Sequence, residues 1–366
     1  MFIMINVTKS FLPPIENYTK LLEGIWNRAH LTNNGPLLME LEEKLKDYFA
    51  AKHFIFLNNG TSAIQIAIKG LGITGEVITT PFSYVATTSS LVWENCEPVF
   101  ADIDSNSLTI DPKLIEPLIT AKTTAILATH VYGIPCDVEG IEKIAKKHKL
   151  KVIYDAAHAF GVNYNGKPLV NYGDASTLSF HATKLFHTTE GGGLVANDET
   201  IAHRFGYMRN FGHKGQEDFW GVGINAKNSE FHAAMGLCVF PYISEIIEKR
   251  KELSELYDRL LINTGIKISR PVVPKGTDYN YAYYPVIFEN EAALLTVRDS
   301  LNAQYVYPRR YFYPSLSTLN YVKKYEVPVS DEISRKVLCL PLYHGLELDQ
   351  VKRICQVITQ VLRFKS

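Results

Sequence analysis

Hydrophobic residues near the start of the chain recur at three- and four-residue spacing over two stretches. The first covers residues 15–30 and the second residues 37–50, where the charged residues fall mostly on the opposite side. This spacing predicts two amphipathic helices. The L-T-N-N-G-P segment between them, residues 31–36, contains helix-breaking residues and predicts a turn. We interpret both helices as scaffold.

From residue 54 the pattern changes to short apolar stretches that alternate with helical ones. Strands are predicted at residues 54–57, 76–80, 97–104, 124–129 and 152–154, and the last of them leads directly to Asp155. Helices are predicted after residue 60, from residue 81 and at residues 138–149. Repeated β-α units of this length indicate a mostly parallel sheet with helices on both faces.

The alternation continues through the middle of the chain. Strands are predicted at residues 177–181 and 192–197, and a helix at residues 198–211. A Gly-rich loop follows and ends at Asn225; loops of this length are usually functional or interfacial. Helical patterning then extends from Ser229 to about residue 261, which we interpret as an arm between two domains.

The C-terminal hundred residues mix both patterns. Strands are predicted at residues 283–288 and 303–307, and helices at residues 291–302 and 349–364. A chain of 366 residues exceeds one ordinary hydrophobic core, so two domains are expected. We place a large α/β domain, with the N-terminal helices, at residues 1–240. The connecting helix and a small C-terminal α+β domain take residues 241–366.

The richest candidate chemistry lies between residues 155 and 193. Asp155 stands at the carboxyl end of a buried strand, where open α/β sheets hold ligands, and the next strand delivers Lys184 into a turn that ends in Gly191, Gly192 and Gly193. We expect these glycines to allow close backbone approach and positive φ. An amine and a carboxylate on neighbouring strand ends suit pyridoxal phosphate, because a lysine binds its aldehyde and a carboxylate keeps its pyridine nitrogen protonated. Taken singly, such a lysine is more often a solvated charge and such an aspartate a cap or turn former.

A second candidate lies where the N-N-G-T-S-A segment, residues 58–63, joins a strand to a helix. Gly60 lets the backbone turn sharply, and Thr61 and Ser62 place hydroxyl and N–H groups at a helix N-terminus. This geometry suits an anion such as a phosphate, and an ordinary helix cap is the alternative. Tyr84, at the next strand-to-helix junction, is suited either to stack on a cofactor ring or to serve as a core tyrosine.

Two arginines stand out in the C-terminal part. Arg309 and Arg310 lie among tyrosines in Y-V-Y-P-R-R-Y-F-Y-P, residues 305–314. Guanidinium groups bind diphosphates or carboxylates in two-pronged contacts. Exposed charges at a strand edge are the alternative reading.

Composition narrows the class of partner. Lys and Arg number 38, as do Asp and Glu, so neither a nucleic-acid groove nor a basic membrane-binding face is indicated. The five cysteines are scattered without a C-x-x-C pair, and the histidines at 130, 158, 181 and 187 fit no metal-ligand spacing, so neither disulfides nor a metal are expected. The N-terminal residues lack signal-peptide features, and no stretch approaches the roughly 20 apolar residues of a membrane helix. We expect a soluble cytoplasmic protein that acts on small molecules.

Several motifs in fixed order make the chain similar to a known family. It resembles the pyridoxal-phosphate sugar aminotransferases of the DegT and StrS type, members of the fold-type-I aspartate aminotransferase superfamily. The matching segments are N-N-G-T-S-A at Asn58, P-F-S-Y-V-A-T at Pro81, H-V-Y-G at His130, D-A-A-H-A-F-G at Asp155, S-F-H-A-T-K at Ser179, E-G-G-G at Glu190 and G-I-N-A-K-N-S-E-F-H-A-A at Gly223. The resemblance implies an α/β, three-layer fold with a mostly parallel central sheet and a smaller C-terminal α+β domain.

The resemblance also implies roles for residues around the cofactor. Lys184 is the covalent attachment point of pyridoxal 5'-phosphate, Asp155 the partner of its pyridine nitrogen, and His158 a contact of the ring or its phenolic oxygen. The implied phosphate contacts are Gly60, Thr61, Ser62 and Ser179, with Tyr84 on the ring.

Other implied roles lie farther from the ring. Asn225 reaches the phosphate held by the other subunit, so a homodimer with shared sites is implied. The implied substrate contacts are His181, Arg309, Arg310, Tyr311 and Tyr313. This chain departs from many relatives at Lys227, where they carry arginine, and from some at Phe312, where they carry histidine.

The activity implied by the resemblance is transfer of an amino group from L-glutamate to a nucleotide-linked keto-sugar. The first choice of acceptor is dTDP-4-keto-6-deoxyglucose, for deoxyamino sugars of surface polysaccharide such as O-antigen. A 3-keto-sugar nucleotide and a UDP-4-keto-sugar are the alternatives. Some relatives that dehydrate sugars carry histidine in place of Lys184, so its presence favours transamination over dehydration. A sensor that binds the cofactor without catalysis is a further alternative.

Overall fold

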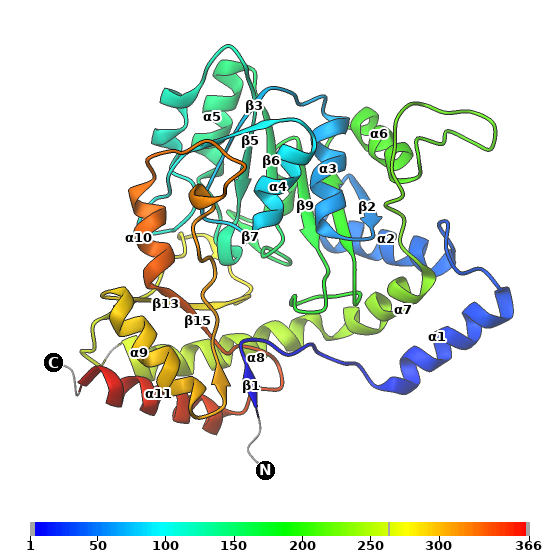
Figure 1. Cartoon of the computed structure of the whole chain (residues 1–366). Coiled ribbons are helices and arrows are strands. Elements are labelled where there is room, and N and C mark those ends of the chain that lie inside the picture. Colours follow the sequence, from blue (N-terminus) through cyan, green and yellow to red (C-terminus); the bar gives the residue numbers. More distant parts are fainter. Residues whose placement is uncertain (1–3, 263, 364–366) are drawn as a thin grey trace.

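The centre of the molecule is a seven-stranded sheet. The computed structural model describes residues 4–262 and 264–363 and gives the strand order β2-β10-β9-β6-β5-β3-β4 (Figure 1). All pairings in this sheet are parallel except those of β10, which is antiparallel to both of its neighbours. The strands are β2 (His53–Leu57), β3 (Glu76–Thr79), β4 (Glu97–Phe100), β5 (Thr123–Thr129), β6 (Lys151–Asp155), β9 (Ala175–Ser179) and β10 (Gly192–Ala196). The predicted α/β class with a mostly parallel sheet is confirmed.

Helices cover both faces of this sheet because its strands are apolar on both sides. In β2, Phe54 and Phe56 belong to one buried cluster and Ile55 and Leu57 to another, as the two-residue period of a strand requires. The first cluster includes residues of α2 (Pro36–Tyr48), α5 (Val138–His148) and α7 (Glu230–Val239). The second includes residues of α3 (Gly60–Gly70), α4 (Val85–Trp93) and α6 (Glu199–Arg209). The result is the three-layer arrangement.

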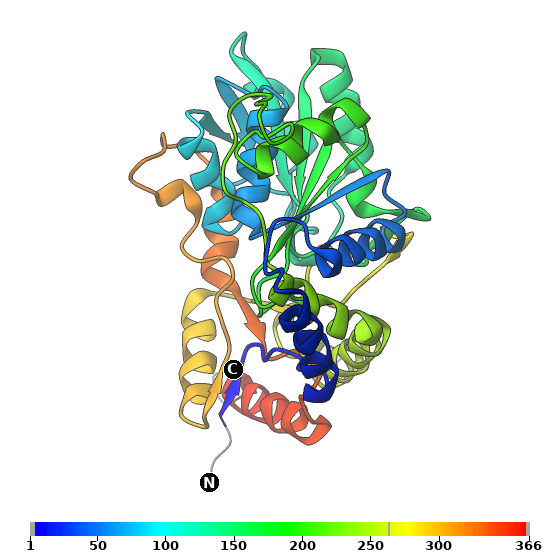
Figure 2. The ribbon, with the colours of Figure 1, turned by 90° about the vertical axis from the view of Figure 1, so that its right-hand side faces the viewer.

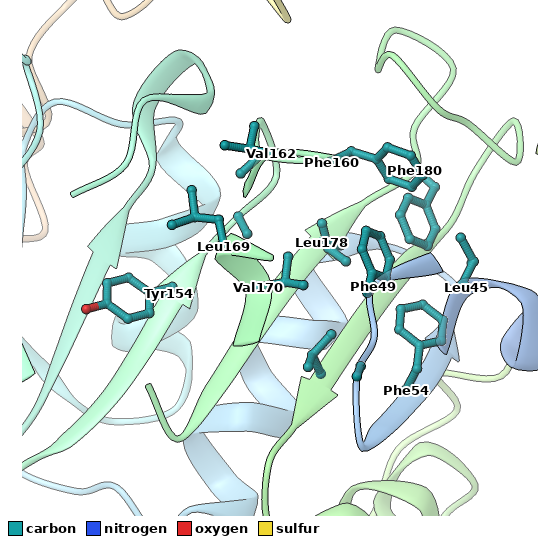
Figure 3. Close-up of a cluster of buried hydrophobic side chains, with 14 of the residues drawn as sticks. Leu45, Phe49, Phe54, Tyr154, Phe160, Val162, Leu169, Val170, Leu178 and Phe180 are labelled. Carbon is teal, nitrogen blue, oxygen red and sulfur yellow. The ribbon is translucent and has the colours of Figure 1, made fainter. Parts of the chain in front are cut away.

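Aromatic rings dominate the first cluster. Figure 3 shows Phe49 at the end of α2 beside Phe54 of β2, with ring centroids 5.9 Å apart. Phe160, from the segment after β6, lies 6.1 Å from Phe180, which directly follows β9. Buried aromatic rings of this size account for a large share of core stability. They therefore hold the segments on either side of Asp155 and Lys184 in place.

A smaller unit follows the long helical segment. The helix α8 (Ile243–Tyr257) continues from α7, and Figure 1 shows the two running beneath the sheet toward α9 and α11. The elements of the smaller unit are β11 (Ile268–Ser269), β13 (Tyr284–Phe288), α9 (Glu291–Asn302), β14 (Val306–Tyr307), α10 (Pro328–Lys336), β15 (Val337–Leu340) and α11 (Leu348–Arg363). Strands β11, β13 and β15 form an antiparallel sheet whose core is separate from that of the large sheet.

The N-terminal strand lies with this smaller unit. β1 (Ile5–Asn6) pairs in parallel with β14, and Figure 2 shows it, in blue, among the elements of the smaller unit. Ile5 is buried in the same cluster as residues of α9 and α11. The chain then crosses to α1 (Ile15–Arg28), which packs on α7. A further small sheet joins β12 (Thr277–Asp278) to β7 (Asn163–Tyr164) and β8 (Lys167–Pro168). The assignment of residues 1–240 to one domain therefore has an exception at β1, since the partner strand of β1 is in the C-terminal part.

Several predicted bounds differ from those observed. The strand expected at residues 177–181 is β9 and ends at Ser179, so the lysine loop is longer than predicted. Of the strand expected at residues 303–307, β14 retains two residues, because the preceding residues form a turn after α9. The strand β15 and the helix α10 had not been predicted. In the described parts of the chain, no helix combines the length and apolarity needed to cross a membrane.

Candidate active site

Asp155 and Lys184 meet at one edge of the central sheet. Asp155 is the last residue of β6, which pairs in parallel with β9 so that Asp155 lies opposite Thr177. Lys184 follows β9 by five residues and is partly buried. Both side chains line a cavity of about 290 Å³. The two neighbouring strand ends thus bring the predicted amine and carboxylate into the same cavity.

Protein donors hold both oxygens of the Asp155 carboxylate. Thr87 Oγ1 donates to Asp155 Oδ2 at 2.6 Å, and the Ala157 N–H donates to Asp155 Oδ1 at 3.1 Å. Burial raises the pKa of Asp155, while these two hydrogen bonds and the positive charge of Lys184 oppose that rise. The side chain is 5% exposed and faces the cavity. It can therefore accept a further hydrogen bond from a ligand.

The Lys184 amine is easier to deprotonate than an ordinary lysine. Burial lowers its pKa from 10.5 to about 8, against the opposing influence of Asp155 and Tyr84. At neutral pH a useful fraction of the amine is thus neutral and nucleophilic.

The N-terminal segment fixes the loop that carries Lys184. Ser10 Oγ donates to the Ala182 carbonyl at 2.6 Å, and His187 Nε2 lies 2.7 Å from the Phe11 carbonyl oxygen. Because a carbonyl oxygen only accepts, His187 carries its proton on Nε2 in this contact. The loop is therefore tied down on both sides of Lys184.

His158 presents an N–H group to the cavity. Its Nδ1 accepts a hydrogen bond from the Tyr132 N–H at 3.1 Å, so a neutral ring carries its proton on Nε2. Burial, followed by the charge of Lys184, holds the pKa of His158 well below its usual range. The ring is parallel to Phe312, with centroids 5.7 Å apart. The neutral imidazole is therefore a rigid hydrogen-bond donor.

The helix α3 supplies the anion-binding end of the cavity. Gly60 and Thr61, in its first turn, line the cavity together with Ser179. A Cβ on Gly60 would lie 3.0 Å from Ser179 Cβ, so glycine here allows α3 and β9 to approach closely. Ser62 is arranged differently, because Asn59 Oδ1 accepts both its N–H at 2.8 Å and its hydroxyl at 3.1 Å. The Ser62 hydroxyl is thus part of the helix cap and does not line the cavity.

The three glycines at residues 191–193 serve close packing and do not adopt positive φ. A Cβ on Gly192 would come within 2.3 Å of the Asn59 carbonyl oxygen, and one on Gly191 within 2.0 Å of Thr188 Oγ1. The residue of this turn that has positive φ is Thr189, at 69°. The prediction of positive φ for the glycines is therefore wrong, while the predicted close approach is confirmed.

Two arginines that are neighbours in the sequence have different surroundings in the structure. Arg309 lines the cavity beside Tyr311, with its guanidinium 4.8 Å from the ring centroid. Arg310 instead pairs with Glu291 at 2.6 Å and lies over the Tyr313 ring, and neither Arg310 nor Tyr313 lines the cavity. Five predicted substrate contacts thus divide into two groups. His181, Arg309 and Tyr311 line the cavity, whereas Arg310 and Tyr313 lie outside it.

Asn225 lies in a different hollow of the surface. This second hollow of about 550 Å³ also contains Lys227, whose Nζ donates to Asn225 Oδ1 at 2.9 Å. Glu190 lines both hollows. Asn225 therefore does not contact the cavity of its own chain, and its predicted role requires a second subunit.

Other cavity residues had no predicted role. Ser83, Thr129, Thr177, Tyr283 and Phe312 line the cavity, and Thr87 lies behind Asp155. Ser83 and Thr87 belong to the P-F-S-Y-V-A-T segment, which was the available signal for them. Within residues 4–262 and 264–363 no group of three or more potential ligands is placed to hold a metal ion, and all five cysteines are buried and unpaired.

The donor set of the cavity fits pyridoxal phosphate. Its parts match the parts of that cofactor: a buried carboxylate for a protonated ring nitrogen, an amine for the aldehyde and an imidazole N–H for the phenolic oxygen. A helix N-terminus with Thr61 and Ser179 suits the phosphate. Tyr84 also lines the cavity and is 56% exposed, so its ring face is free to stack. All of these groups line the same cavity.

Comparison with known proteins gives consistent matches over most of the chain. The DegT/DnrJ/EryC1/StrS aminotransferase family matches residues 15–359. The chain is 41% identical to dTDP-4-amino-4,6-dideoxy-D-glucose transaminase of Shigella dysenteriae over 367 residues, which covers 98% of this chain and 99% of that protein.

Two solved structures extend this comparison. The crystal structure of DesI in the presence of its TDP-sugar product has a TM-score of 0.92 and 29% identity, covering 99% of this chain and 94% of that one. NtdA from Bacillus subtilis with bound cofactor PMP has a TM-score of 0.88 and 26% identity, covering 95% of this chain and 82% of that one. With a family match over residues 15–359 and a shared fold, the chain belongs to the DegT/DnrJ/EryC1/StrS aminotransferase family.

Proposed function

We propose that this protein is a pyridoxal-phosphate-dependent aminotransferase that moves an amino group from L-glutamate to a nucleotide-linked keto-sugar. The observation that carries the proposal is the shared cavity of Asp155 and Lys184 at neighbouring strand ends. The first choice of acceptor is dTDP-4-keto-6-deoxyglucose. It corresponds to the sugar named for the Shigella dysenteriae relative, which is similar over nearly its whole length.

Each proposed cofactor contact has a defined task. When bound, pyridoxal phosphate supplies an aldehyde that reacts with amines and a ring that accepts electrons. Asp155 binds the ring nitrogen and keeps it protonated, and His158 donates its Nε2–H to the phenolic oxygen. Thr61 and Ser179 bind the phosphate with the N-terminus of α3, and Tyr84 stacks on the ring.

Lys184 moves protons as well as binding the cofactor. With a pKa of about 8 the amine can take a proton near neutral pH and return it, as a general base and then a general acid. It takes the proton from the α-carbon of glutamate and gives one to the sugar carbon that receives nitrogen. Both tasks are assigned to the same amine because Lys184 is the lysine among the residues that line the cavity.

Arg309 is the proposed anchor for anionic substrates. Its guanidinium faces the cavity, and it has no ion-pair partner among residues 4–262 and 264–363. Glutamate and sugar nucleotides both carry negative charge, which a guanidinium binds through paired hydrogen bonds. Among the other predicted contacts, His181 and Tyr311 line the same cavity.

A panel of sugar nucleotides tests the acceptor. The purified protein in its pyridoxamine form is mixed with dTDP-, UDP- and GDP-linked 4-keto-sugars and with 3-keto isomers, and the cofactor absorbance is followed. We expect the dTDP-4-keto-6-deoxyglucose sample to restore the original spectrum fastest. A faster response to a UDP-linked or 3-keto compound would make that compound the proposed acceptor instead. A product that loses water without gaining nitrogen would indicate a dehydratase, and no response to glutamate would indicate a sensor.

We also propose a homodimer in which Asn225 completes the site of the other subunit. The loop before Asn225 exposes Phe211, Phe219, Trp220 and Val222, each at least 42% exposed, and such apolar surface is typical of an interface. The test mixes an Asn225→Ala subunit with a Lys184→Ala subunit. On symmetry grounds about one working site should form per mixed dimer, and inactivity of the mixture would contradict a shared site. A cytoplasmic location and a role in O-antigen sugar synthesis complete this proposal.

The proposed division into domains follows the two hydrophobic cores. One core contains residues of the large sheet, and the other contains residues of α9, α11, β13 and β15. We retain the boundary at residue 240, between α7 and α8, with β1 and β12 as exceptions, because each pairs with a strand on the other side of the boundary.

A further inference from the structure

A row of three buried hydroxyl groups ends at Asp155. Thr129 Oγ1 lies 3.0 Å from Ser83 Oγ, and Ser83 Oγ lies 2.8 Å from Thr87 Oγ1. Thr87 Oγ1 in turn lies 2.6 Å from Asp155 Oδ2. All four side chains are at most 5% exposed. We call Thr129, Ser83 and Thr87 the hydroxyl chain.

The direction of every proton in the hydroxyl chain follows from the carboxylate. An ionised carboxylate only accepts hydrogen bonds, so the proton of Thr87 points to Asp155. A hydroxyl has one proton, so Ser83 must donate to Thr87, and Thr129 must then donate to Ser83. All three O–H dipoles therefore point toward Asp155. Hydrogen bonds aligned in this way strengthen one another in a buried setting.

We propose that the hydroxyl chain positions Asp155 and keeps its carboxylate ionised. This inference rests on the proposed function, in which an ionised Asp155 keeps the ring nitrogen of the cofactor protonated. The three hydroxyl residues come from the end of β5, the segment before α4 and the first turn of α4. Thr87 and its two partners are positioning residues, because they act on the cofactor through Asp155.

Few other groups stabilise this buried charge. Among the groups that act on Asp155, burial raises its pKa, and the Ala157 N–H and the Lys184 amine oppose that rise alongside Thr87. The Cys136 thiol also lies close enough to interact, and burial raises its pKa, so it stays neutral. Lys184 loses its charge as pH rises through about 8. Above that pH, Thr87 and Ala157 are the remaining groups that favour the ionised form.

The neighbouring residue Thr88 provides a matched control. It is also on α4 and completely buried, but its Oγ1 has no hydrogen-bond partner in the described parts of the chain. Burial of a hydroxyl in α4 therefore does not by itself produce a hydrogen bond. Thr88→Val removes a hydroxyl of equal size and equal burial while leaving the hydroxyl chain intact.

The test compares Thr87→Val, Thr87→Ser and Thr88→Val in the full-length protein. Thermal unfolding of each cofactor-free variant is measured from pH 5 to pH 9. Each substitution is tested by itself and in combination with Asp155→Asn. The absorbance of the bound cofactor is titrated over the same range, and kcat and KM are measured with glutamate. The unfolding and absorbance measurements need no sugar substrate, so a wrong acceptor would leave them unaffected.

We expect Thr87→Val to raise the pKa of Asp155 by about one unit, a tenfold change in the ratio of ionised to neutral carboxylate. The kcat should fall about tenfold with little change in KM, because the interaction acts on the reacting ring. Since a raised carboxyl pKa makes the native state bind more protons, the stability deficit should grow as pH rises. Thr87→Ser and Thr88→Val should resemble the unmodified protein. When Asp155→Asn is also present, the pH-dependent part of the stability deficit caused by Thr87→Val should disappear.

Clear outcomes would overturn the proposal. It fails if Thr87→Val and Thr88→Val have the same pH profile, or if Thr87→Ser is as impaired as Thr87→Val, which would indicate a packing role. It also fails if Thr87→Val has the same pH-dependent deficit with and without Asp155. If Thr87→Val does not fold, Ser83→Ala takes its place in the test. We then expect kcat to fall about threefold and the pKa of Asp155 to rise by about half a unit.

Discussion

The floor and the outer wall of the cavity are built in different ways. The floor consists of Asp155, His158 and Lys184, which are buried or partly buried and held through hydrogen bonds or a tied loop. The outer wall contains Arg309, which is exposed to solvent. A fixed floor would suit a cofactor that stays bound through the reaction. An exposed wall suits substrates that enter and leave.

The difference follows from the elements that carry each wall. Asp155 and His158 stand at or just after the end of β6, in the middle of the sheet, and the loop that carries Lys184 after β9 is tied to the N-terminal segment. The outer wall includes loop residues from the C-terminal unit, reached through α8. Sheet ends fix a side chain more firmly than loops do, because each strand is held by two neighbours. Changes to the floor should therefore affect chemistry, and changes to the outer wall should affect substrate binding.

The largest effect is expected from Lys184→Ala. Removal of the amine should reduce turnover by about 10⁴-fold, the upper range for a proton-transferring group. The unmodified protein should be yellow, and borohydride should fix the cofactor to the peptide that contains Lys184. Circular dichroism of the variant checks that the fold is retained. Label on a peptide without Lys184 would contradict the assignment.

The next largest effect is expected from Asp155→Ala. Turnover should fall by roughly 100-fold or more, in the range seen when an electrostatic partner of a reacting group is lost. The cofactor should still bind, since Lys184 and the end of α3 remain. Steady-state kinetics and absorbance of the bound cofactor measure the two effects separately. Near-normal turnover would show that the floor does not need this carboxylate.

Much of the floor could be predicted from the sequence. The apolar stretch before Asp155 and the shorter one before Lys184 indicated two strands, and parallel strands place their carboxyl ends at one edge. The hydroxyl partners of Asp155 could not be predicted in the same way. Thr87 is 68 residues from Asp155, and a buried threonine has no distinctive pattern.

The outer wall shows where such prediction stops. Arg309 and Arg310 are adjacent and looked equivalent in the sequence. The Arg309 backbone forms an antiparallel bridge with Cys339, and successive side chains on extended backbone point to opposite sides. Arg310 consequently meets Glu291, which is 19 residues earlier in the chain. The pairing depends on how α9 packs, and local pattern does not specify that.

A smaller effect is expected when pH changes the charge of Lys184. Because its pKa is about 8, uptake of pyridoxal phosphate by the cofactor-free protein should slow about tenfold per pH unit below pH 8 and level off above it. The absorbance of the bound cofactor measures the rate. With an unperturbed lysine, the rate of cofactor uptake would instead continue to rise up to the ordinary lysine pKa of 10.5.

The same shift has a consequence for stability. The pKa of Lys184 is lower in the folded protein than in the unfolded chain, so the unfolded chain binds more protons between about pH 8 and pH 10.5. The free energy of unfolding should rise with pH in that window, and Lys184→Met should lose this part of the rise. Identical pH profiles of the two proteins in urea unfolding would contradict the shifted pKa.

The smallest effect is expected on the outer wall, from Arg309→Gln. Loss of one solvent-exposed guanidinium should raise the KM for the anionic substrate by about tenfold and change kcat little, because the contact holds the substrate without touching the reacting atoms. The matched control is Arg310→Gln, which removes the same charge from the adjacent residue. Since Arg310 is paired with Glu291 outside the cavity, it should lower the melting temperature slightly and leave KM unchanged. Equal KM values for the two variants would show that Arg309 does not bind the substrate. A fall in kcat alone would show that Arg309 acts on the reaction itself and not on substrate binding.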